Sequence, residues 1–133
     1  MTSLRASSQF KKLLVIDDEP SVLLALKLLL EALGFSVTDM PTPTEALAHL
    51  AAKKDYDVIL CDLRMPEMDG ITVLREAKRI APTIPFVLIS GHAQTEEVET
   101  AMKYKVDGFL DKPFTPDQLG DVFNKLAGKK TVG

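Results

Sequence analysis

The sequence predicts one α/β domain in which five strands alternate with five helices, and three observations carry this prediction. First, residues 13–16, 58–61 and 86–89 are apolar at every position, which is typical of strands buried on both faces of a parallel sheet. Second, segments with helical spacing of apolar residues separate these runs. Third, 133 residues suffice for one such domain. This alternation implies right-handed crossovers with helices on both faces, but periodicity does not determine the strand order.

Two further strands and the domain limits follow from shorter signals. Residues 35–40 alternate between apolar and polar, as expected of an edge strand, and Phe109 with Leu110 is a very short candidate for the fifth strand. The chain therefore divides into a disordered leader at residues 1–10, a folded domain at residues 11–127, and a C-terminal tail or start of a linker at residues 128–133.

The helices are predicted from apolar spacing together with capping residues. Apolar side chains at helical spacing over residues 22–33 predict the first helix, and Gly34 is suited to end it. Thr42, Pro43 and Glu45 form the capping pattern that begins the second helix. The third and fourth helices are predicted over residues 71–81 and 95–105, and the fifth from the cap residue Thr115 to Leu126.

Composition excludes several classes of function. The net charge of −3 lacks the basic excess of a nucleic-acid-binding surface, so no direct contact with nucleic acid is expected. No apolar run reaches the roughly 18 residues of a membrane span, and the N-terminus has no signal-peptide core. Cys61, the one cysteine, can form neither an internal disulfide nor a zinc cluster, and we expect it to be buried and inert. These observations favour a cytoplasmic setting.

Polar and charged residues follow four of the five predicted strands. Asp17 and Asp18 come directly after the first strand, Asp62 ends the third, Ser90 ends the fourth and Lys112 follows the fifth. The carboxyl ends of parallel strands meet at one edge of the sheet, where ligands bind in open α/β folds. We therefore expect these side chains to lie close together.

The chemistry of such a cluster favours a divalent cation and a phosphoryl group. Crowded carboxylates repel one another unless a cation lies among them, and an all-oxygen set suits Mg²⁺ best, with Mn²⁺ as an alternative. An ammonium at Lys112 and a hydroxyl donor at Ser90 would complete a socket for a phosphoryl group. A carboxylate in that socket is a natural nucleophile, and the product would be an aspartyl phosphate.

Four motifs, in this order and spacing, resemble the response-regulator receiver (CheY-like) domain of two-component signalling. The resemblance covers residues 11 to 126, and the four motifs together are specific although each alone is weak. The resemblance implies a flavodoxin-like fold with strand order 2-1-3-4-5. The motifs are LLVIDDE at residues 13–19, DLRMPEMDG at 62–70, VLISG at 87–91 and GFLDKPF at 108–114.

The resemblance also implies roles for the acidic residues. Asp62 matches the phosphoacceptor, and Asp18 with Asp62 matches the carboxylates that bind Mg²⁺ directly. Asp17 matches the acid that reaches the ion through water, and the backbone carbonyl of Arg64 matches a further ligand.

The remaining matches concern the switch. Ser90 matches the hydroxyl that follows the phosphoryl group, Lys112 matches the lysine that pairs with it, and Phe109 matches the aromatic switch residue. The Lys112–Pro113 bond is expected to be cis, since only an X–Pro bond makes the cis form inexpensive, at about 0.5–1 kcal/mol. Gly70 is expected in a turn that permits a positive φ.

This chain departs from the family pattern in two places. Phe109 lacks the hydroxyl of the more common tyrosine. The fourth helix usually ends in Gly-Ala, but Lys105 and Val106 stand here, and a left-handed lysine costs roughly 1 kcal/mol, so the helix end is expected to differ.

The function that the residues and the resemblance favour is a phosphorylation switch. A histidine kinase or phosphotransfer protein would donate the phosphoryl group to Asp62. The surface formed by the fourth helix, fifth strand and fifth helix would then change, and a downstream output domain or protein would read it, with a homodimer through that surface as one outcome. The domain would catalyse only its own phosphorylation and dephosphorylation.

Other classes remain as alternatives. A phosphorylation-independent binding module of the same fold is supported only by the departures at Lys105, Val106 and Phe109. A hydrolase with an Asp nucleophile would carry Asp-x-Asp at the first strand and a cap domain, whereas the two acids here are adjacent. A flavin-binding protein would need a phosphate-cradling loop where Asp17 and Asp18 stand.

Overall fold

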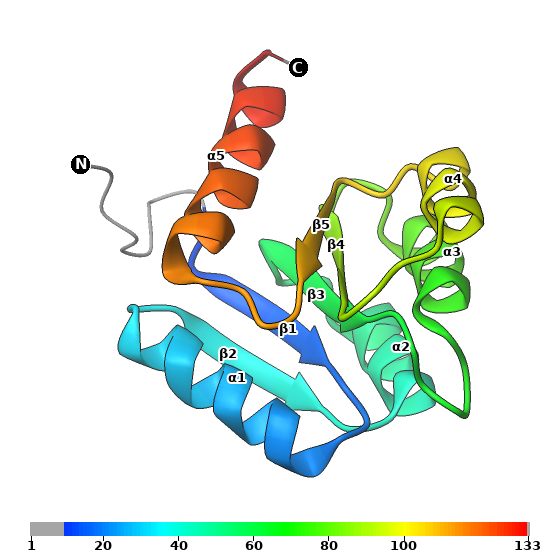
Figure 1. Ribbon diagram of the computed structural model, residues 1–133, viewed down its shortest axis with the longest axis horizontal. Helices are drawn as coiled ribbons and strands as arrows, with labels where there is room; N and C mark the ends of the chain where they lie inside the picture. The colour runs from blue at the N-terminus through cyan, green and yellow to red at the C-terminus, as the bar shows by residue number, and fades with distance from the viewer. Residues whose placement is uncertain (1–9, 133) are drawn as a thin grey trace.

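A five-stranded parallel sheet forms the centre of the molecule (Figure 1). The computed structural model describes residues 10–132, with side chains as far as residue 128. The strand order β2-β1-β3-β4-β5 confirms the flavodoxin-like order that the resemblance implied. The strands are β1 (Lys12–Ile16), β2 (Ser36–Met40), β3 (Val58–Asp62), β4 (Phe86–Ser90) and β5 (Gly108–Asp111).

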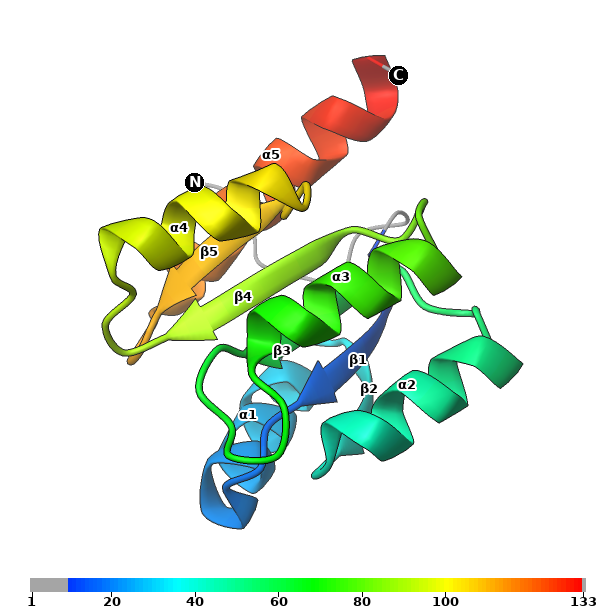
Figure 2. The ribbon, with the colours of Figure 1, turned by 90° about the vertical axis from the view of Figure 1, so that its right-hand side faces the viewer.

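Helices cover both faces of this sheet, as the alternating pattern predicts. The helices are α1 (Pro20–Ala32), α2 (Pro43–Ala52), α3 (Gly70–Ile80), α4 (Thr95–Lys103) and α5 (Pro116–Val132). Helices α1 and α5 pack on one face, and α2, α3 and α4 pack on the other (Figure 2). Within residues 10–132, no helix combines the length and apolarity needed to cross a membrane.

The buried strands supply both halves of the core. Leu14 and Ile16 of β1 point to the side of α2, α3 and α4, whereas Leu13 and Val15 point to the side of α1 and α5. Successive strand residues face opposite sides of a sheet, so a strand covered on both sides must be apolar throughout. This requirement explains the unbroken apolar runs, and it leaves the strand ends free to carry polar side chains.

Two of the predicted domain limits are wrong. Phe10, which we assigned to the leader, is 2% exposed, and its ring lies 5.6 Å from that of Phe123, so an aromatic contact ties it to the core. The predicted tail is helical, because α5 continues to Val132. No proline follows Pro116 within this helix, so the backbone hydrogen bonds can continue. Residues 1–9 and 133 lie outside the described residues.

Helix α4 ends in a left-handed residue although that residue is a lysine. Lys105 adopts a left-handed conformation with φ 67°. Its N–H donates to the carbonyl of Met102 at 3.0 Å, and the N–H of Val106 donates to that of Ala101 at 3.1 Å. These two bonds form a Schellman motif, and burial of Val106 against the core completes it. The left-handed conformation thus forms at Lys105 despite its strain, because the backbone hydrogen bonds stabilise it.

That strain gives a stability prediction. Lys105→Gly is expected to raise the free energy of unfolding by about 0.5–1 kcal/mol, because glycine adopts the left-handed region without a Cβ clash but loses more entropy on folding. Urea unfolding measures the difference. Gly34, with φ 99°, occupies the matching position after α1, so Gly34→Lys is the control and should lose a similar amount. A destabilised Lys105→Gly chain would contradict the prediction.

Candidate functional site

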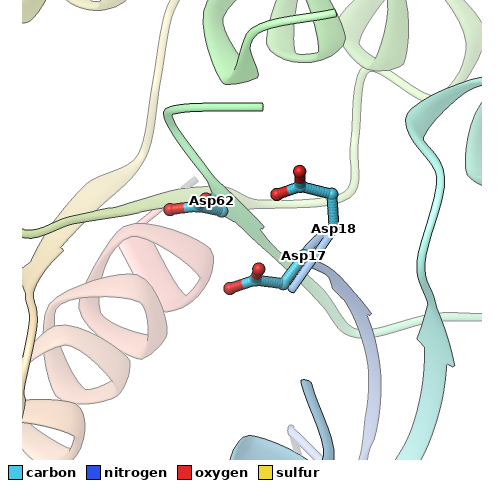
Figure 3. Close-up of side chains that lie close together, drawn as sticks. All are labelled: Asp17, Asp18 and Asp62. Carbon is cyan, nitrogen blue, oxygen red and sulfur yellow. The ribbon is translucent and has the colours of Figure 1, made fainter. Parts of the chain in front are cut away.

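Three carboxylates meet at the carboxyl edge of the sheet (Figure 3). One oxygen from each of Asp17, Asp18 and Asp62 can be chosen so that all three lie within 4.8 Å of one another. Strand β1 pairs with β3, so Asp17 and Asp18, which follow β1, are neighbours of Asp62, which ends β3. The close approach predicted from the positions of these acids in the sequence is therefore present.

Lys112 joins this cluster from the loop after β5. Its ammonium Nζ lies 3.0 Å from Oδ1 of Asp62 and 3.2 Å from Oδ2 of Asp17. The Lys112–Pro113 peptide bond is cis, as predicted. The backbone N–H of Lys112 donates to the carbonyl of Ser90 at 2.9 Å, which ties the end of β5 to that of β4.

The buried position of the acids alters their protonation. Asp17 is 1% exposed and Asp62 is 6% exposed. Burial raises the pKa of Asp62, and the negative charges of Asp17 and Asp18 add to this rise, although hydrogen bonding and attraction from Lys112 oppose it. Burial lowers the pKa of Lys112, but its hydrogen bond to Asp62 and the charges of both acids outweigh burial, so this pKa is raised overall. The ammonium is therefore held in its charged form.

The pKa of Asp62 makes stability depend on pH in a cation-free buffer. Between the ordinary value of 3.8 and the raised value, the folded chain binds more protons than the unfolded chain. The free energy of unfolding contributed by this group therefore falls as pH rises through that interval. We expect the stability of Asp62→Asn relative to the native chain to increase over the same interval and then level off. Thermal unfolding across pH measures it, and a difference that is constant with pH would contradict it.

The buried hydroxyl of Ser90 lies one residue beyond Ile89, the partner of Asp62 across the β3–β4 pair. Its Oγ accepts a hydrogen bond from the backbone N–H of His92 at 3.1 Å. Ser90 and Phe109 line the same hollow of about 530 Å³ between the loop after β4 and strand β5. The hydroxyl proton of Ser90 is left available for a further acceptor.

Gly70 is required for a reason other than the predicted one. It begins α3 and has no positive φ, so the expected turn conformation is wrong. A Cβ at this position would lie 2.5 Å from the backbone oxygen of Asp62, 2.8 Å from Cα of Leu63 and 2.7 Å from Cδ2 of Leu88. Glycine is needed because the start of α3 packs directly against the backbone at the end of β3.

The side chain of Arg64 makes contacts that the sequence reasoning did not anticipate. Its guanidinium donates from Nη1 to Oε2 of Glu97 at 2.9 Å and from Nη2 to Oε1 at 2.7 Å. Nη2 also donates to the carbonyl of His92 at 2.9 Å. The hydrogen bond from the N–H of Gln94 and the one from Arg64 lower the pKa of Glu97. The spacing of Gln94 and Glu97 in the sequence is typical of a capping box. This local pattern does not indicate that Glu97 also binds Arg64.

The acidic cluster fits a divalent cation. With all four groups ionised, Asp17, Asp18, Asp62 and Lys112 carry a combined charge of −2, which a divalent ion balances. All the candidate ligands are oxygens, and a hard ion such as Mg²⁺ prefers oxygen. Burial is the main cause of the raised pKa of Asp62, and the negative charges of Asp17 and Asp18 add to it, so a cation among these oxygens would favour the ionised carboxylate.

Comparison with known proteins identifies the family. A family model described as the response regulator receiver domain matches residues 13–124. The chain is 35% identical over 122 residues to the transcriptional regulatory protein ZraR of Salmonella typhimurium, a match that covers 91% of this chain and 27% of that protein. It is also 35% identical over 106 residues to the C4-dicarboxylate transport transcriptional regulatory protein DctD of Rhizobium meliloti, covering 79% and 23%. The chain thus spans about a quarter of the length of these relatives.

Solved structures show the same fold. A response regulator receiver domain protein from Clostridium thermocellum superposes with a TM-score of 0.83 at 33% identity, covering 93% of this chain and all of that one (100%). A CheY-like receiver domain protein from Methanospirillum hungatei gives a TM-score of 0.83 at 27% identity, covering 93% and 99%. The chain belongs to the response regulator receiver domain family, a class of signalling modules of two-component systems that do not turn over a separate substrate.

Proposed function

We propose that this domain accepts a phosphoryl group on Asp62 from a phosphohistidine of a histidine kinase or phosphotransfer protein. The observation that carries the proposal is the ammonium of Lys112, which lies 3.0 Å from Oδ1 of Asp62 and also contacts Asp17. The Asp62 carboxylate is buried, paired with an ammonium and accompanied by two further acids. Such a site can hold the positive charge of a cation and the negative charge of a phosphoryl group.

In the transfer step, an oxygen of the Asp62 carboxylate bonds to phosphorus as the P–N bond of the phosphohistidine breaks. The imidazole leaves with the electron pair, and the phosphoryl oxygens keep their negative charge. Lys112 contacts Asp62 before the reaction and can follow the new oxygens afterwards. Hydrolysis reverses the modification, because water attacks phosphorus and restores the carboxylate with release of phosphate.

Asp18, Asp62 and the backbone carbonyl of Arg64 would hold Mg²⁺ directly, and Asp17 would hold it through water. Mn²⁺ is an alternative ion for the same oxygens. When bound, the ion supplies positive charge that offsets the negative charge of the transferring group. The three-carboxylate cluster of the described residues supports this assignment.

Ser90 and Phe109 would carry the change away from the site. The hydroxyl of Ser90 can donate to a phosphoryl oxygen, and Phe109 lines the hollow beside it. Movement there would alter the α4-β5-α5 surface, which a downstream output domain or protein, or a second copy of the chain, would read. The setting would be cytoplasmic. Of the departures that support a phosphorylation-independent module, Lys105 and Val106 lie in a hydrogen-bonded helix end.

The test is intact mass after incubation with phosphoramidate and Mg²⁺. We expect a single added phosphoryl group on the native chain, none on Asp62→Asn, and none when the cation is removed with a chelator. Peptide mapping then locates the group. Phosphate uptake by Asp62→Asn at the native stoichiometry would overturn the assignment of the acceptor, and failure of the native chain to gain mass from this donor and from acetyl phosphate would overturn the function.

A further inference from the structure

An ionic contact joins the loop after the proposed acceptor to the start of helix α4. Arg64 lies two residues after Asp62, and its guanidinium makes two parallel hydrogen bonds with the Glu97 carboxylate at 2.9 and 2.7 Å. The same guanidinium binds the carbonyl of His92 at 2.9 Å. Paired bonds of this kind fix both distance and orientation, unlike a single contact. The Arg64–Glu97 pair therefore positions two segments that are far apart in sequence.

The Glu97 carboxylate also caps α4. Its Oε1 accepts from the backbone N–H of Gln94 at 2.8 Å, in addition to Nη2 of Arg64 at 2.7 Å. One carboxylate thus holds both the first turn of α4 and the loop after β3. The segment reaches back to the site as well, because the N–H of His92 donates to Oγ of Ser90 at 3.1 Å.

Helix α4 has few other constraints on its position. Ala101 is its one buried residue, whereas α1 buries Leu23, Leu26 and Leu30. Among the ion pairs of the described residues, Arg64–Glu97 is the one that reaches α4. A helix with so little buried surface depends more than its neighbours on polar contacts at its ends.

We propose that Glu97 is a positioning residue that couples the acceptor loop to helix α4 through Arg64. This inference rests on the proposed function, since the event to be coupled is loading of Asp62. When the loop after β3 adjusts to a new group on Asp62, the paired hydrogen bonds carry that adjustment to Gln94 and the first turn of α4. Without them the loop can respond while α4 stays in its resting state.

Hydrogen exchange of the full chain tests the coupling, with beryllofluoride and Mg²⁺ as the probe for a loaded Asp62. The measured quantity is the ratio of amide exchange rates with and without the probe across residues 92–103. Glu97→Gln retains an acceptor for the Gln94 N–H but loses the charge that binds Arg64. In Glu97→Gln we expect the ratio of exchange rates across residues 92–103 to move towards one by roughly two- to fivefold, the range for an exposed ion pair. The ratio over the loop at residues 63–69 should stay native.

The matched control is Glu76→Gln, which breaks an Arg–Glu pair at 2.8 Å within α3. This variant should show the native ratio. Arg64→Met also removes the hydrogen bond to the carbonyl of His92. The effect of Arg64→Met combined with Glu97→Gln should therefore be smaller than the sum of the two single effects, because both changes remove the shared Arg64–Glu97 contact. A purely structural role for Glu97 would raise α4 exchange equally in both states and leave the ratio unchanged.

The outcomes separate the two proposals. A native ratio in Glu97→Gln, or an equal loss in Glu76→Gln, overturns the coupling while probe binding upholds the loading of Asp62. Failure of the native chain to bind beryllofluoride, detected as absence of Mg²⁺-dependent thermal stabilisation by the probe, overturns the proposed function and the coupling with it.

Discussion

Replacing Lys112 by Met is expected to slow phosphoryl uptake by about 10²–10³-fold, the usual cost of removing one group that stabilises transition-state charge. The ammonium lies 3.0 Å from the proposed nucleophilic carboxylate, and among the ion pairs of the described residues no other reaches Asp62. Methionine retains the length and apolar character of the stem. The rate is measured by intact mass against time with phosphoramidate and Mg²⁺.

The same substitution should have the opposite effect on the cation. Lys112 repels a divalent ion that binds to Asp17 and Asp62, so its removal is expected to tighten Mg²⁺ binding several-fold, as titration calorimetry would show. Tighter binding together with slower transfer distinguishes loss of chemistry from loss of the site. Lys27→Met is the control. Lys27 pairs with Asp39 of β2 at 3.5 Å, and β2 and β5 lie on opposite sides of β3 in the sheet, so this pair is remote from the loop that carries Lys112. A Lys112→Met chain that reacts within about twofold of native would remove Lys112 from the mechanism.

Gly70→Ala is expected to lower the free energy of unfolding by about 1–3 kcal/mol, as overpacking in a close-packed core does. The added Cβ would meet the backbone oxygen of Asp62 at 2.5 Å and Cα of Leu63 at 2.8 Å. Backbone atoms at the end of a central strand cannot move aside cheaply. The gain in helix propensity, at most about 1 kcal/mol, opposes this loss without cancelling it.

Gly91→Ala provides the matched control. Gly91 lies in the loop after β4, and a Cβ there would meet nothing within 4 Å. Its effect on stability is expected to stay within about 0.5 kcal/mol. Urea unfolding of both variants measures the contrast. Equal stabilities for Gly70→Ala and the native chain would show that the start of α3 can shift away from β3, and the close approach at Asp62 would lose its structural importance.

Much of the architecture could be predicted from local patterns. The apolar runs at residues 58–61 and 86–89 lie within β3 and β4, because a strand covered on both faces has no position for a polar side chain except at its end. Thr42 caps α2 as its spacing from Glu45 predicts, with the Thr42 side chain accepting from the Glu45 N–H. Such features depend on neighbours within a few residues, and these neighbours are visible in the sequence.

The acidic cluster was predictable for a different reason. Asp17, Asp18 and Asp62 stand at the ends of strands, and all parallel strands end at one edge of the sheet, so the fold class alone brings them together. The strand order needed the family resemblance, because pairing of β1 with both β2 and β3 leaves no periodic signal in the chain.

Contacts between distant segments were decided by the tertiary structure. Phe10 lies in the core on the side of α1 and α5, and its ring is 5.6 Å from that of Phe123 of α5. Gly70 is constrained by the backbone of β3, and no local rule for turns describes that contact. Arg64 and Glu97 are 33 residues apart, and nothing near either one identifies its partner. The sequence by itself therefore determined the elements and which polar side chains stand at the sheet edge, whereas packing across the fold determined which residues hold that edge in place.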